Sequence, residues 1–108
     1  MAQFAIMLYL PAPAALADIP PEELAAQERH GAELEELGVK IVSGYALEGS
    51  TAARTVRGET VADGPFTATA EVLAGFLVIE ARDADHALEV GRRNPAVRRG
   101  AVEVRPLL

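Results

Sequence analysis

The order of apolar runs, helical segments and turn signals predicts an α+β fold with a ferredoxin-like βαββαβ subunit. Short apolar runs rich in β-forming residues alternate with two segments of helical period, in the order strand, helix, strand, strand, helix, strand. The chain has 108 residues, half of them apolar, which is the size of one domain with a modest core. We therefore expect a single domain over residues 1–108.

The first strand and the first helix are the clearest elements. Residues 3–10 are apolar at nearly every position and stop at a Pro-Ala-Pro-Ala segment, which is typical of a strand buried on both faces. The next segment begins with Ile-Pro-Pro, carries two glutamates in its first turn and stops at Gly38, as expected of a helix. Its predicted inward residues are Leu24, Gly31, Leu34 and Leu37.

The middle of the chain predicts further strands joined by turns. Residues 39–47 form the second strand, and residues 53–57 and 59–62, which Gly58 separates, predict a third strand or a hairpin leading to Asp63. A short helical turn is expected at residues 67–73.

The last third of the sequence repeats the pattern of strand, helix and strand. Residues 75–81 predict another strand buried on both faces, and the following helix is capped by Asp83 and ended by Asn94 and Pro95. The predicted inward residues of this helix are Ala84, Ala87, Leu88 and Gly91. In the closing strand, residues 101–107, Val102 and Val104 share one face, and Glu103 and Arg105 share the other.

This order of elements predicts a homodimer. Crossovers of one hand place both helices on the same face of the sheet, yet the strands at residues 3–10 and 75–81 are apolar on both faces. A second copy packed sheet against sheet would cover the other face and bury about 800 Å² per partner. A ligand pocket would then lie between sheet and helix or at the dimer seam.

Composition excludes several classes of function. A net charge of −6 repels nucleic acid and anionic membranes. No apolar stretch is long enough to span a bilayer, and the opening residues lack the basic start of a signal peptide, so we expect a cytoplasmic protein. The chain has no cysteine and only two histidines without acidic clusters at ligand spacing, so neither a metal nor a cofactor is predicted.

The two histidines are predicted to differ in environment. His30 falls between Leu34 and Leu37 on the apolar stripe of the first helix and points inward. It is either a core histidine with satisfied hydrogen bonds or a general acid/base, a role that suits imidazole because its pKa is near 6.5. His86 is expected on the outer face of the second helix, in solvent.

The turn Val-Ala-Asp-Gly-Pro-Phe raises the question of what Asp63 does. A turn needs only Asp63 and Gly64, but Pro65 stiffens this one and Phe66 is expected to anchor it by burying its ring. Asp63 is therefore either a turn residue or a carboxylate that orients His30. In the second case the two side chains should lie within about 3.5 Å or one water apart, and the His30 pKa should be raised unless burial offsets this.

Arg92, Arg93, Arg98 and Arg99 form a basic cluster in an acidic chain. They are either arginines at a helix end, favoured by the helix dipole, or an anchor for a small anionic ligand.

Six blocks in order resemble the YCII-related, DGPF-domain family: the His-Gly of the first helix, SGYAL, ARTVR, DGPF, GFLVIEA and GAVEVRPLL. The resemblance covers nearly the whole chain and implies a dimeric α+β barrel of ferredoxin-like subunits, with a site built on His30 and Asp63. This chain departs from the family at Ala68 and Ala70, where relatives often carry glutamate and lysine, and at Tyr45, where they usually carry glutamate.

The resemblance leaves two functional classes open. As an enzyme, the protein would use His30 for proton transfer on a small lactone-like or aromatic-derived substrate, with Asp63 fixing the imidazole. Ser43 or Tyr45 would offer a hydrogen bond to that substrate, and Phe66 would border it. As a binding or regulatory module, the same pocket would hold a metabolite and report to a partner protein such as a sigma factor.

Overall fold

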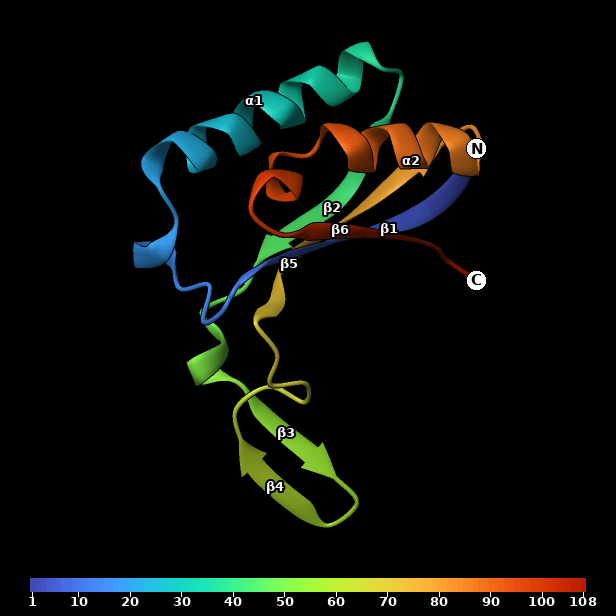
Figure 1. Ribbon diagram of the computed structural model, residues 1–108. Coiled ribbons are helices and arrows are strands. Elements are labelled where there is room, and N and C mark those ends of the chain that lie inside the picture. The colour runs from blue at the N-terminus through green and yellow to red at the C-terminus, as the bar shows by residue number, and fades with distance from the viewer.

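The computed structural model describes residues 1–108 and has a four-stranded antiparallel sheet at its centre (Figure 1). Its central strands, β1 (Ala2–Pro11) and β5 (Glu71–Ala81), are the two long apolar runs, and they pair along their whole length. The edge strands are β2 (Lys40–Ala46) and β6 (Ala101–Pro106), so the strand order is β2-β5-β1-β6. An antiparallel sheet with this order and two crossover helices is compatible with the predicted ferredoxin-like fold.

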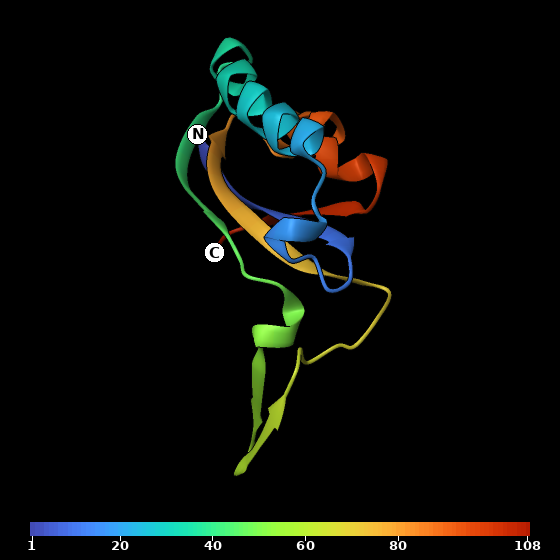
Figure 2. The same ribbon diagram turned by 90° about the vertical axis from the view of Figure 1, so that its left-hand side faces the viewer.

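Both helices lie on one face of this sheet, and no helix covers the other face (Figure 2). The first, α1 (Pro21–Glu36), starts with a proline at its first position, where no backbone N–H is required. It ends in a Schellman motif: Gly38 has φ +73°, and the Val39 N–H donates to the Leu34 carbonyl at 3.0 Å. The second helix is α2 (Ala84–Arg93). Neither is long and apolar enough to cross a membrane.

The main core lies between the helices and the sheet. Alternate residues of β1 point toward the helices, so Phe4 and Ile6 are buried, as are Ile79 and Ala81 of β5. The eight residues of this cluster are Phe4, Ile6, Leu34, Val39, Ile79, Ala81, Ala87 and Val90. On β6, Val102 and Val104 pack against it, as the predicted alternation requires.

The predicted inward face of α2 is partly wrong. The structure buries His86, Ala87, Val90 and Gly91, whereas Leu88 is 43% exposed. His86, expected in solvent, is buried because both ring nitrogens have partners: Nδ1 accepts from the Arg82 backbone N–H at 3.1 Å, and Nε2 lies 2.8 Å from the Leu37 carbonyl. The Asp83 cap is confirmed, since its carboxylate accepts from the His86 backbone N–H at 2.9 Å.

A hairpin projects from the sheet and belongs to neither layer (Figures 1 and 2). Its strands β3 (Arg54–Arg57) and β4 (Thr60–Asp63) pair only with each other. We call this segment the hairpin arm. The helical turn expected at residues 67–73 is not formed, because β5 already begins at Glu71 and takes up the last three residues of that segment. Short 3-10 turns complete the chain at Leu16–Asp18, Ser50–Ala52 and Pro95–Arg98.

Candidate functional site

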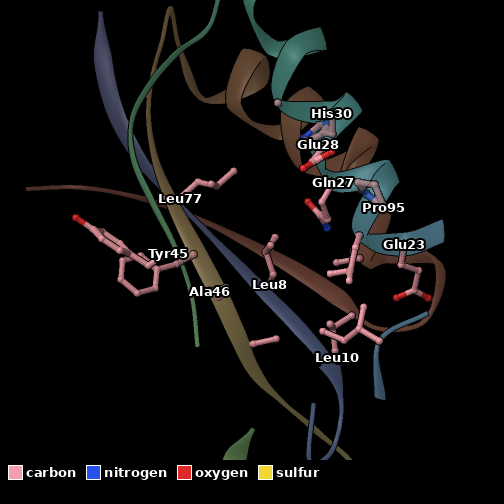
Figure 3. Close-up of a pocket in the computed structure, with 18 of the residues that line it drawn as sticks. Leu8, Leu10, Glu23, Gln27, Glu28, His30, Tyr45, Ala46, Leu77 and Pro95 are labelled. Carbon is pink, nitrogen blue, oxygen red and sulfur yellow. The ribbon is translucent and has the colours of Figure 1, made fainter. Parts of the chain in front are cut away.

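A cavity of about 370 Å³ separates α1 from the sheet, and most of the residues that line it are hydrophobic. Figure 3 shows the side chains of α1 along one side of it and Leu8, Leu10 and Leu77 of the sheet opposite. The lining includes small residues, which are Gly31 on α1, Gly44 and Ala46 on β2, and Ala74 and Gly75 on β5. Gly31 leaves space open, because an added Cβ would meet no heavy atom within 4 Å, whereas Leu77 and the Tyr45 carbonyl already occupy that position at Gly44 and Gly75.

His30 is the polar residue that the cavity leaves unsatisfied. It projects from α1, lines the cavity and is only 3% exposed, so the predicted inward orientation is confirmed. Both of its ring nitrogens are buried and neither has a hydrogen-bond partner. An unpaired polar group of this kind costs about 1–3 kcal/mol, and native structures contain few of them. The side chain is therefore buried without the satisfying contacts expected of a core histidine.

Burial also controls the charge of His30. Desolvation lowers its pKa from the ordinary value of 6.5; the Glu33 carboxylate opposes this and the Arg93 guanidinium adds to it, but burial dominates. Burial thus outweighs any rise in the His30 pKa, which is the exception that the prediction allowed. A lowered pKa leaves the imidazole uncharged at neutral pH, with one N–H donor and one acceptor nitrogen.

Two other polar side chains that line the cavity, Gln27 and Glu23, already have partners. The side-chain amides of Gln27 and Asn94 exchange hydrogen bonds of 2.9 and 3.3 Å, and Asn94 Oδ1 also accepts from the Ala96 backbone N–H. The Glu23 carboxylate receives a two-pronged ion pair from Arg99. These pairs tie α1 to the segment after α2 and leave His30 as the free hydrogen-bonding side chain of the interior.

Asp63 does not meet His30 within this chain. It ends β4 on the hairpin arm, its side chain is 94% exposed, and its carboxylate lies 3.8 Å from the Arg54 guanidinium. The turn after it is well defined, because Gly64 has φ +96°, its N–H donates to the Ala53 carbonyl at 2.7 Å, and its carbonyl accepts from Thr55. This geometry holds Asp63 on the hairpin arm, so its carboxylate does not line the cavity.

Of the remaining predicted site residues, Tyr45 borders the cavity, whereas Ser43 and Phe66 do not line it. Phe66 is 71% exposed with the Arg57 guanidinium 5.5 Å from its ring centre, so the prediction that it buries its ring is wrong. Ser43 is half-buried opposite Val78 and does not line the cavity. Tyr45 borders the cavity, but Figure 3 shows its ring turned away from α1. That ring packs against Phe76, with 5.5 Å between the ring centres.

The basic cluster fits the helix-end interpretation. Arg92 and Arg93 contact the Glu89 carboxylate at 3.7 and 2.8 Å, and Arg99 pairs with Glu23. Three of the four guanidinium groups thus have acidic neighbours and are not gathered around a vacant anion site. No three His, Asp or Glu side chains come together as metal ligands.

Sequence reasoning missed the paired amides and the small residues that shape the cavity. Gln27 sits one turn before His30 on α1, and this spacing was the available signal for a second polar side chain on the inner face. Asn94 was recognised only as a helix stop, because its partner is 67 residues away.

Comparison with known proteins gives two matches. Residues 2–108 match the family described as the YCII-related domain. An uncharacterized protein of Rhizobium meliloti (strain 1021) is 46% identical over 66 residues, which cover 54% of this chain and 52% of the relative. The chain thus spans about half the length of the curated relative that it matches.

Proposed function

This chain belongs to the YCII-related domain family, and we propose that it binds a small, largely apolar molecule in the cavity between α1 and the sheet. The observation that carries this proposal is His30, buried at the cavity wall with both ring nitrogens unpaired. A bound molecule with a hydrogen-bonding group would remove that cost, and its apolar part would contact Leu8, Leu10 and Leu77.

Thermal-shift screening of the purified protein against a metabolite panel tests this function. Ligands that raise the melting temperature of the wild type should fail to raise that of Ala46→Trp, since a large ring at this cavity-lining position of β2 occupies the space. Lys40→Trp, an exposed substitution on the same strand, is the matched control and should respond like the wild type. Equal shifts in all three proteins would place the ligand elsewhere.

Proton transfer by His30 is the second candidate function, and the lowered pKa favours it, because an uncharged imidazole can accept a proton at neutral pH. The enzyme would remove a proton next to the carbonyl of a bound lactone-like or aromatic-derived substrate. Deuterium exchange into 2-tetralone, a bicyclic ketone of suitable size, followed by NMR in D₂O, separates this function from simple binding. Catalysis requires exchange faster than in buffer with the wild type but not with His30→Gln; binding alone gives the buffer rate with both.

The proposal includes a homodimer formed by the uncovered sheet face. Because Phe4 and Ile6 point to the helices, the residues between and beyond them point to the opposite face, which no helix covers (Figure 2). The residues of that face on β1 and β5 include Ala5, Met7, Tyr9, Phe76 and Val78. Sedimentation at micromolar concentration should give about twice the chain mass, and a clean monomer would rule the dimer out.

Within such a dimer, the Asp63 carboxylate could orient the His30 imidazole only from the hairpin arm of the second copy. In the same dimer, Ser43, Tyr45 and Phe66 would contact a ligand at the seam between the two copies. An NMR titration of His30 in the wild type and Asp63→Asn tests the pair, since loss of a nearby carboxylate lowers the His30 pKa further. An unchanged titration would make Asp63 a turn residue.

A further inference from the structure

The cavity between α1 and the sheet contains no positively charged side chain that could balance an anionic ligand. No lysine or arginine lines it, and the lining residues with a carboxylate are Glu23 and Glu28. Arg99, which reaches Glu23, uses its guanidinium in that ion pair. A buried carboxylate or phosphate would find no free cation, because the Arg99 guanidinium is engaged by Glu23 and the other nearby charge is the Glu28 carboxylate, and this strongly disfavours its transfer from water.

A cationic ligand gains little here as well. Glu23 is already neutralised by Arg99, so a second cation would have to displace it. Glu28 also lines the cavity, but it is exposed to solvent, and water weakens its attraction for a cation. The apolar walls formed by Leu8, Leu10 and Leu77 offer no compensation for a desolvated ammonium group.

His30 specifies the one polar group that the ligand needs. An uncharged imidazole presents one N–H donor and one acceptor nitrogen, and neither has a partner in the chain. A hydroxyl of a phenol or an enol both donates and accepts, so it can use whichever nitrogen faces it. At about 30 Å³ per water molecule, a cavity of 370 Å³ accommodates a body of about a dozen non-hydrogen atoms.

We propose that the ligand of this site is an uncharged phenol or enol with a compact, ring-containing apolar body, and that its hydroxyl hydrogen-bonds His30. This inference rests on the proposed function, because it specifies the ligand class of the same cavity. It adds a selectivity that the proposed function alone does not require: rejection of acids and amines with the same apolar body.

Four probes that share one ring system test the selectivity: 2-naphthol, naphthalene, 2-naphthoate and the ammonium form of 2-naphthylmethylamine. Affinities and the imidazole NMR signals of His30 are measured at neutral pH. The wild type should bind 2-naphthol about tenfold more tightly than naphthalene, the value of one hydrogen bond made to a buried group. Naphthoate and the ammonium probe should bind at least roughly a hundredfold more weakly than 2-naphthol, because their charges lose water without gaining a partner.

The variant His30→Leu assigns the polar contact. It removes the unpaired nitrogens from an apolar environment, so it is expected to fold, and its melting curve confirms this. It should bind naphthalene as the wild type does and lose the preference for 2-naphthol; a preference that persists would overturn the role of His30. If naphthoate or the ammonium probe binds the wild type as tightly as 2-naphthol, the ligand class is wrong and the site stands. If no probe shifts the His30 signals, the proposed site itself fails.

Discussion

Replacing Gly31 tests whether the cavity is open beside this residue of α1 and how much stability the glycine costs. Glycine in the interior of a helix is about 0.5–1 kcal/mol less favourable than alanine. A Cβ atom built at Gly31 meets no heavy atom within 4 Å, so Gly31→Ala gains this propensity without a clash. A domain of this size shifts its melting temperature by roughly 4–8 °C per kcal/mol, so the expected increase is roughly 2–8 °C.

A larger side chain at the same position should separate stability from binding. Gly31→Leu adds three carbons beyond alanine, each worth about 0.8 kcal/mol when buried, and Gly31 is half-buried. We expect a further gain of about 1 kcal/mol, together with roughly tenfold weaker ligand binding, because the new side chain takes cavity volume. Differential scanning calorimetry and ligand titration on the same samples measure the two effects.

Gly38→Ala is the matched control for this prediction. Gly38 also has no heavy atom within 4 Å of an added Cβ, but its φ of +73° is strained for alanine, so this variant should lose about 1 kcal/mol. If Gly31→Ala is destabilised as much as Gly38→Ala, the space beside Gly31 is filled. If Gly31→Leu binds ligand as tightly as the wild type, Gly31 does not border the ligand.

Three further predictions concern the histidines and the cap of α2. Burial lowers the pKa of folded His30, so the unfolded chain binds the proton more readily, and the stability present above about pH 6.5 is lost as pH falls toward the lowered folded value. Urea unfolding between pH 7 and 5 should therefore show a smaller loss for His30→Gln than for the wild type, and parallel curves would contradict this. His86→Ala should cost about 2–3 kcal/mol in chemical denaturation, because two backbone groups lose their partner, whereas Leu88→Ala, at an exposed position, should cost well under half as much. Asp83→Ala should lower the free energy of unfolding by about 0.5–2 kcal/mol through loss of the N-cap, and an unchanged value would mean that the cap is replaced by water.

Local sequence patterns were sufficient to predict the strands whose side chains alternate between two faces and the helix that begins at a capping residue. The apolar run at residues 3–10 indicated the central strand β1, and the alternation around Val102 and Val104 assigned the faces of β6. Asp83 marked the start of α2 because its short carboxylate can reach a free backbone N–H. In each case the decisive contact lies within a few residues or follows from strand periodicity.

The failures occur where the decisive contact is distant in sequence. Counting apolar residues placed Leu88 inside and His86 outside, but the imidazole binds a backbone carbonyl 49 residues away and can therefore be buried. The cavity beside His30 depends on side chains that are too small to fill it, and a pattern of apolar residues does not record empty space. The pairing of Asp63 with His30 was one of two alternatives and rested on their chemistry and on the family resemblance. Within one chain the hairpin arm, whose direction no local signal specifies, holds Asp63 outside the cavity, so the pairing stays a prediction for the dimer.

The hairpin arm has a consequence for local opening of the structure. Its four residue pairs are held by their own ladder and by the turn at Gly64, and a two-stranded hairpin of this kind is marginally stable in water. Such a segment can open without disturbing the core, so in an isolated chain its amide hydrogens should exchange with solvent far sooner than those of β1 and β5. Val56 and Val61, both well exposed and directly paired, would gain protection as soon as another surface covered them. Exchange rates in the arm thus report whether the protein is alone or assembled, without any label or bound ligand.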